Sequence, residues 1–217
     1  MHCAIGVINE ELKFFIHIPY SKQLFSRIKS EQVHINVLEL IALFLGYVLF
    51  LVEYKSNPSV FPPAPQVVLW GDNMSANKWF QTFSTNLLIA TKTLQLFAEY
   101  MKDSQVSANP QHIPGKLNVE ADGISRVQEL CSPHKQFVYD ISYKSLLLQV
   151  LRSYNNLRSF RLFLPSREML SDLSMLLTSG NLMEELKRRK CCGRFVPVDY
   201  IFSGSATSTN SCTSYFL

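Results

Sequence analysis

Residues 35–53 have the sequence INVLELIALFLGYVLFLVE, and this stretch decides how the chain can fold. Residues 40–52 form an unbroken apolar run of thirteen residues between Glu39 and Glu53. A bilayer-spanning helix needs about 20 apolar residues, so the run predicts a buried core helix. Asn36 is expected to be its N-cap, with Glu39 at the third helical position in a loose capping box. A carboxylate buried beside so apolar a run costs free energy unless it has hydrogen-bonding or ionic partners or serves a function.

The segments on either side of this helix alternate between strand and helix patterns. Apolar runs that stop at turn residues predict strands over residues 3–9, 12–18 and 66–70 and a weaker one over 105–113. Near-helical spacing of apolar residues predicts further helices over 75–80, 86–101 and 118–126. The predicted order is β, β, α, β, α, α, β, α, which indicates an α/β fold with helices packed on a sheet.

The character of the sequence changes near residue 127. Residues 127–202 are predicted to be a helical extension of unknown role, with one helix over 143–163 and a second that starts at 165–166 and runs through 177. The basic run KRRK at 187–190 is either a solvated face or a nucleic-acid or nuclear-localisation patch. Residues 203–217 are rich in Ser and Thr without periodicity, which predicts a disordered tail.

The composition excludes several classes of protein without selecting a function. Only 18% of the 217 residues are charged and 47% are hydrophobic, which excludes wholesale disorder and provides for a sizeable core. The net charge of +4 is too mild to indicate a partner by itself. Five scattered cysteines are typical of a reduced, intracellular protein, and the first residues do not have the pattern of a signal peptide.

Three acidic residues lie at the ends of predicted elements in apolar surroundings. Glu39 is in the first turn of the apolar helix, Asp72 follows the strand QVVLW, and Asp122 opens the last helix before residue 127. Taken singly, each has an ordinary structural explanation as a helix-start charge or a turn residue. Groups beyond strand ends and at helix starts of an α/β sheet meet in one crevice, however. Clustered carboxylates without basic neighbours are typical of Mg²⁺ or Mn²⁺ sites.

Three sequence motifs, in order along the chain, together resemble those of a known protein family. INVLELIA at 35–42, VLWGDNMSA at 68–76 and HIPGKLNVEADGISR at 112–126 resemble successive motifs of the RNase H domain of retroelement reverse transcriptases. The similarity is greatest to long-terminal-repeat and related retrotransposons, and it covers residues 1–126. It implies an RNase H-like mixed sheet flanked by helices, followed here by the helical extension and the tail.

The resemblance also implies an activity, a metal and partners. The family hydrolyses the RNA strand of RNA–DNA hybrids with Mg²⁺ (or Mn²⁺), and Glu39, Asp72 and Asp122 would be catalytic residues and metal ligands. The implied partners are an RNA–DNA hybrid or other nucleic acid and, in the parent polyprotein, an upstream reverse transcriptase domain, with no membrane. The expected location is intracellular, either cytoplasmic or nuclear.

The same motifs supply candidate contacts to nucleic acid. Asn73 and Ser75 would face the hybrid backbone, and Lys116 and Arg126 would contact phosphates. A generic solvated surface explains the two basic side chains equally well. His112 has two open roles, as a structural residue at a strand end or as a mobile histidine near the last aspartate.

One departure from the family pattern bears on activity. The family carries four carboxylates, the first on an opening strand before the strand that Gly6 to Ile8 matches. Residues 1–9 contain no acid, and Glu10 and Glu11 fall in the following turn, where solvated side chains are expected. The first strand is therefore predicted to be incomplete, which implies impaired cleavage. Two alternatives stay open: a non-catalytic RNase H-like binding or spacer module, and a membrane-associated protein that uses residues 40–52.

Overall fold

The computed structural model describes residues 4–20, 22–125, 157, 159–166, 169, 173, 176–177 and 193–197. These residues form a mixed α/β structure, as the alternating pattern predicted. The strands are β1 (Ala4–Asn9), β2 (Phe14–Pro19), β3 (Gln66–Gly71), β4 (Ser107–His112), β5 (Arg161–Pro165) and β6 (Gly193–Pro197). The α-helices are α1 (Lys22–Lys29), α2 (Ile35–Ser56), α3 (Met74–Thr82), α4 (Leu88–Ser104) and α5 (Val119–Ser125). Two 3-10 turns, η1 (Pro58–Val60) and η2 (Gly115–Leu117), complete these elements.

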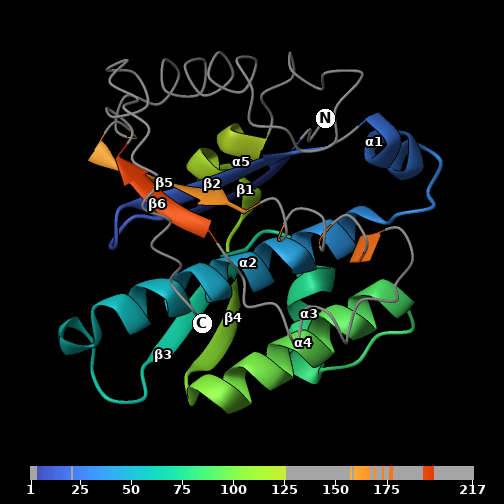
Figure 1. Ribbon diagram of the computed structural model, residues 1–217. Coiled ribbons are helices and arrows are strands. Elements are labelled where there is room, and N and C mark those ends of the chain that lie inside the picture. The colour runs from blue at the N-terminus through green and yellow to red at the C-terminus, as the bar shows by residue number, and fades with distance from the viewer. Residues whose placement is uncertain are drawn as a thin grey trace.

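The strands form two separate sheets. One sheet has four strands in the order β1-β2-β5-β6. It is a mixed sheet, because β1 runs antiparallel to β2 whereas β5 runs parallel to it. The other is the parallel pair β3-β4. Figure 1 shows α2 crossing the molecule between the four-stranded sheet and helices α3 and α4.

Helix α2 is buried on almost all of its faces. It contacts β1 and β3 as well as α3 and α4, so apolar residues are needed around its whole circumference. Leu40, Ile41, Leu45 and Val48 are all fully buried. By length and composition α2 is able to cross a membrane, and most of its apolar window is buried inside the fold, as in the core helix of a soluble protein.

The start of α2 differs from the prediction. The N-cap is His34, whose Nδ1 accepts a hydrogen bond from the Asn36 N–H at 3.2 Å, so Asn36 is already inside the helix. Glu39 consequently lies in the second turn, and the predicted capping box is wrong. The Asn36 side chain instead accepts a hydrogen bond from Asn73 Nδ2 at 2.8 Å. This contact ties the first turn of α2 to the end of β3, a partner that no local pattern specifies.

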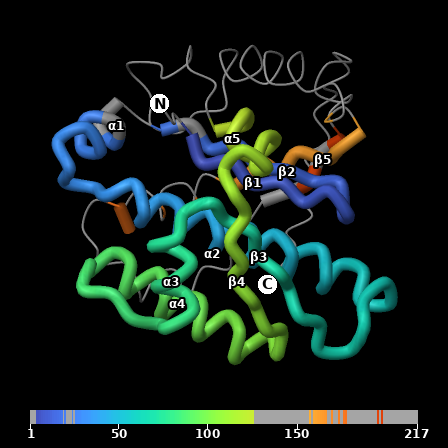
Figure 2. Tube along the Cα trace, turned by 180° about the vertical axis from the view of Figure 1, so that it is seen from behind, coloured from blue at the N-terminus to red at the C-terminus, as the bar shows by residue number. Residues whose placement is uncertain are grey.

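Two helices cover opposite faces of β1. A Cβ on Gly6 would meet α5, while the Val7 side chain reaches α2 beside Gly46. Alternate residues of a strand point to opposite faces, which explains the arrangement. Figure 2 shows α5 on the side of β1 and β2 away from α2.

The prediction that residues 127–202 form a helical extension is wrong at two places, where the structure has strands. Residues 161–163, the end of the predicted helix 143–163, belong to strand β5, which pairs with β2, and residues 193–197 form β6. The free edge of β2 supplies backbone partners that outweigh the helical pattern, and Leu162 and Phe163 are fully buried there. Residues 126–156 and the tail at 203–217 lie outside the described residues.

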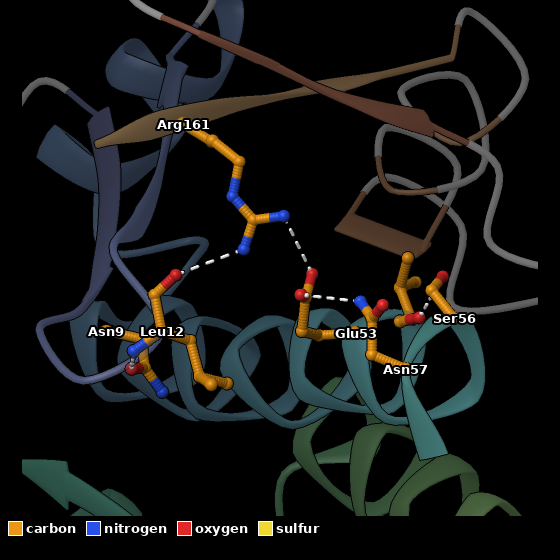
Figure 3. A network of polar contacts seen from close by, with 7 residues as sticks. Asn9, Leu12, Glu53, Ser56, Asn57 and Arg161 are labelled. Atoms are coloured by element: carbon orange, nitrogen blue, oxygen red, sulfur yellow. Dashed lines mark hydrogen bonds and ion pairs between the residues drawn. The ribbon is translucent and has the colours of Figure 1, made fainter. Parts of the chain in front are cut away.

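A polar network attaches β5 to α2 (Figure 3). Arg161 Nη1 lies 3.1 Å from Glu53 Oε2, and Arg161 Nη2 donates to the Leu12 carbonyl at 3.0 Å. Asn57 Nδ2 donates to the other Glu53 oxygen at 3.0 Å. Glu53 is 7% exposed, so these partners satisfy a carboxylate that would otherwise be buried alone.

Candidate functional site: three carboxylates at one cavity

The three predicted acidic residues line a single small cavity of about 30 Å³. Glu39 comes from the second turn of α2, Asp72 from the residue after β3, and Asp122 from α5. The start of β1, from Ala4 to Gly6, forms another wall. All three acidic residues are half-buried, so their carboxylates interact through a medium less polar than bulk water.

The charges of these residues act on one another. The pKa of Glu39 is raised from its ordinary value of 4.5 to about 7, first by burial and then by the negative charges of Asp72 and Asp122. No Lys, Arg or His is among the described residues that line the cavity. The described part of the wall therefore places acidic side chains together and contributes no basic one.

The donor chemistry of the cavity fits a hard divalent cation, because its described lining offers the oxygens of three carboxyl groups. Within the described ranges, no three His, Cys, Asp or Glu residues are grouped closely enough to hold one metal ion. The fold thus brings Glu39, Asp72 and Asp122 to a common cavity without assembling a finished ligand set.

Asn73 has a structural task in the fold. Its Oδ1 accepts a hydrogen bond from the Ala76 N–H at 2.9 Å and caps α3, while its Nδ2 donates to Asn36. Both polar ends of the side chain are thus engaged. Asn73 therefore positions Asp72, its neighbour in the chain, by tying the end of β3 to α2 and α3.

Two further candidates for nucleic-acid contact, Ser75 and Lys116, are not among the residues that line the carboxylate cavity. Ser75 is exposed in the first turn of α3, and Lys116 is exposed in η2. Arg126 lies outside the described residues. His112 is exposed at the end of β4, and neither His112 nor Lys116 lines the carboxylate cavity.

Gly6 is a site residue whose role the sequence did not disclose. A Cβ at Gly6 would lie 2.8 Å from the Ala121 carbonyl oxygen and 3.0 Å from the Ser125 nitrogen. Only glycine allows α5 to approach β1 this closely, and that approach brings Asp122 to the cavity. A glycine between apolar residues in a strand is the signal that would have suggested it.

Replacing Gly6 with alanine is expected to lower the free energy of unfolding by about 1–3 kcal/mol, because the new Cβ forces α5 outward. The same shift moves Asp122 away from Glu39, so the pKa of Glu39 should fall. Urea denaturation and an NMR titration of the Glu39 carboxyl measure the two effects. Gly115→Ala is the matched control, since its Cβ would lie 3.5 Å from Asp72 Oδ2, an ordinary contact. Unchanged stability and an unchanged Glu39 pKa in Gly6→Ala would contradict the role of this contact.

A larger cavity of about 650 Å³ adjoins the carboxylates. It is lined by β1 residues 6–9, by all of β3, and by the face of α2 that carries Glu39, Leu43 and Phe50. Its volume is in the range of ligand-binding clefts.

Comparison of the chain with family models, with curated proteins and with solved structures gives no match. The α/β fold and the three carboxylates at one cavity are the observations from which a function can be inferred.

Proposed function

We propose that the protein is a retroelement-derived RNase H-like domain whose carboxylate cavity binds Mg²⁺ (or Mn²⁺) and faces an RNA–DNA hybrid. The observation that carries the proposal is that Glu39, Asp72 and Asp122 line one cavity, where burial and the charges of the two aspartates raise the pKa of Glu39. Three acidic residues from separate elements accumulate negative charge at one point, which is stable when a cation neutralises it. The α/β architecture is compatible with this assignment.

In this proposal the cation would lie in the cavity that Glu39, Asp72 and Asp122 line, and it would be held weakly because these residues do not form a finished ligand set. A bound divalent cation supplies Lewis-acid chemistry at a phosphodiester. Glu39, with a pKa of about 7, binds a proton over half of the time below that pH, so the cation and the proton compete for the same carboxyl. Lys116 lies in η2, between β4 and α5, at a place where an exposed ammonium group is available to a phosphate.

A specific observation favours the second candidate function, a non-catalytic RNase H-like module that binds nucleic acid or spaces neighbouring domains. Among the described residues, only three acidic side chains line the small cavity, and they do not form a finished ligand set. One weakly held ion cannot both activate water and stabilise the leaving oxygen, as a two-metal site does. We therefore expect negligible cleavage of an RNA–DNA hybrid by the 217-residue chain.

Calorimetric titration with Mg²⁺ tests the cation site. The affinity should be about tenfold higher at pH 8 than at pH 6, because deprotonated Glu39 is the binding form. Asp72→Asn should weaken binding at both pH values, whereas Asp103→Asn, an exposed change at the end of α4, should not. Equal affinities at the two pH values, together with an unaffected Asp72→Asn variant, would overturn the proposed site.

A hybrid assay then separates the enzyme from the binding module. An RNA–DNA hybrid is incubated with the chain in Mg²⁺ and in Mn²⁺, and binding and cleavage are both measured. Binding without cleavage supports the module. Cleavage that disappears in Asp72→Asn supports the nuclease, and the absence of both binding and cleavage contradicts either function.

A further inference from the structure

One side chain of α3 lies where β3 and β4 end, next to the carboxylate cavity. Helix α3 packs against both strands, and Asn77 in its first turn is only 4% exposed. Asn77 Nδ2 donates to the Gly71 carbonyl at 2.8 Å and to the Gln111 carbonyl at 3.3 Å. Gly71 is the last residue of β3, and Gln111 is the last but one of β4. A single amide group therefore bridges the ends of both strands.

The Gly71 carbonyl is held from two directions. Besides the Asn77 amide, it accepts a hydrogen bond from the Ile113 N–H at 3.1 Å, just after β4. Because a peptide unit is planar, a fixed carbonyl also fixes the N–H of the next residue, and here that residue is Asp72. The direction in which the chain leaves β3 and enters Asp72 is thus set by Asn77 together with Ile113.

The same bridge acts on the loop that follows β4. A Cβ on Gly115 in η2 would lie 3.5 Å from Asp72 Oδ2, so this loop lies against the Asp72 carboxylate. The loop leads directly into α5, where the Asn118 carbonyl accepts a hydrogen bond from the Asp122 N–H at 3.0 Å. Asn77 therefore holds together the two chain segments that lead into Asp72 and Asp122.

Gly71 provides the space that the Asn77 amide occupies. A Cβ on Gly71 would lie 3.2 Å from Asn77 Oδ1 and 3.2 Å from Leu43 Cδ2. Both distances are shorter than a comfortable contact between such atoms, so a side chain here would displace the amide from the strand end. Glycine in a strand often marks this kind of close approach.

The hydrogen bonding of Asn77 points to positioning rather than to packing. Its Oδ1 is buried and has no hydrogen-bond partner among the described residues. Burying such an oxygen costs free energy, whereas a leucine of similar size would fill the space without that cost. The contribution of the amide therefore lies in the two bonds that Nδ2 donates. These bonds keep the ends of β3 and β4 in place although the carboxylates of the cavity repel one another.

We propose that Asn77 is a positioning residue of the carboxylate site, whose side-chain amide ties the ends of β3 and β4 together and holds Asp72 close to Glu39. Asn77 is not among the described residues that line the cavity, so it acts through Asp72. Without the amide, the strand ends relax, the carboxylates separate, and the cavity binds a divalent cation less well. The inference deepens the proposed function and rests on it for the role of the cation.

A double-mutant cycle between Asn77→Leu and Asp72→Asn tests the positioning role in metal-free protein. Free energies of unfolding in urea are measured at pH 8, where most of Glu39 is ionised. Asp72→Asn should stabilise the wild type, because it removes a repulsive charge from the cavity. In the Asn77→Leu background this gain should be smaller by at least about half, because Asp72 has already moved away, whereas a purely structural role of Asn77 would leave the two changes additive.

Gln81→Leu is the matched control for the cycle. It also removes a bond from α3 to β4, since Gln81 Nε2 donates to the Pro110 carbonyl at 3.4 Å, but it lies one turn farther along the helix. The gain from Asp72→Asn should be unchanged in this background. Calorimetry at pH 8 should show a loss of Mg²⁺ affinity of about tenfold in Asn77→Leu and no loss in Gln81→Leu.

The outcomes separate this inference from the proposed cation site. Equal gains from Asp72→Asn in the wild type and in Asn77→Leu overturn the positioning role, and so does an equal reduction in Gln81→Leu. A reduced gain in Asn77→Leu alone supports it, and if the wild type then binds no Mg²⁺, only the cation site is contradicted. If Asn77→Leu does not fold, Gly71→Ala takes its place in the cycle, because its Cβ displaces the amide, and an unchanged gain there overturns the inference.

Discussion

Phe97→Ala is expected to lower the free energy of unfolding by about 3–5 kcal/mol, the loss typical of a large aromatic side chain removed from a core. Phe97 on α4 is fully buried. Its ring centroid lies 4.1 Å from that of Phe80 on α3, 5.1 Å from that of Phe44 and 5.8 Å from that of Tyr47, both on α2. The substitution therefore leaves a cavity where three helices meet.

Urea denaturation followed by circular dichroism measures this loss. The control is Phe83→Ala, which removes the same type of side chain from a residue that is 46% exposed. Among the described residues its one ring contact is with Phe80, at 5.4 Å between centroids. Its expected cost is below about 1 kcal/mol, since little apolar surface is returned to water. Equal losses in the two variants would contradict the packing of α2, α3 and α4 around Phe97.

Glu39→Gln is expected to stabilise the folded protein in a way that depends on pH. The carboxyl of Glu39 has a pKa of about 7 in the folded state and an ordinary value of 4.5, so the folded state binds the extra proton between these values. The stability of the wild type should consequently fall as the pH rises from about 4.5 to 7. At pH 8 the ionised carboxylate costs at most about 3 kcal/mol, which the neutral amide avoids.

Paired urea denaturations at pH 4.5 and pH 8 test this expectation. Glu39→Gln and the wild type should differ little at pH 4.5, and the variant should be more stable at pH 8. Glu31→Gln, an exposed change after α1, controls for the general loss of a charge and should show no such dependence. A difference of the same size at both pH values would mean that burial and the charges of Asp72 and Asp122 do not act on Glu39.

The sequence alone determined the type and order of most elements in residues 4–125. Apolar runs bounded by Pro, Gly and Asn locate β1, β2 and β3, and helical spacing locates α2, α3 and α4. These patterns are local, so they can be read without knowing what each element packs against. The sequence also nominated Glu39, Asp72 and Asp122, because each acidic residue interrupts an apolar setting at the end of an element.

Only the tertiary structure decided which distant segments meet. The pairing of β5 with β2 overrides a helical pattern, because a free strand edge and a buried core outweigh local propensity. The same holds for Asn36, which bonds to Asn73 rather than capping its own helix. The raised pKa of Glu39 arises from burial and from charges 33 and 83 residues away in the chain, at Asp72 and Asp122. Electrostatic energy depends on separation in space and on the surrounding dielectric, and neither quantity is contained in a linear pattern.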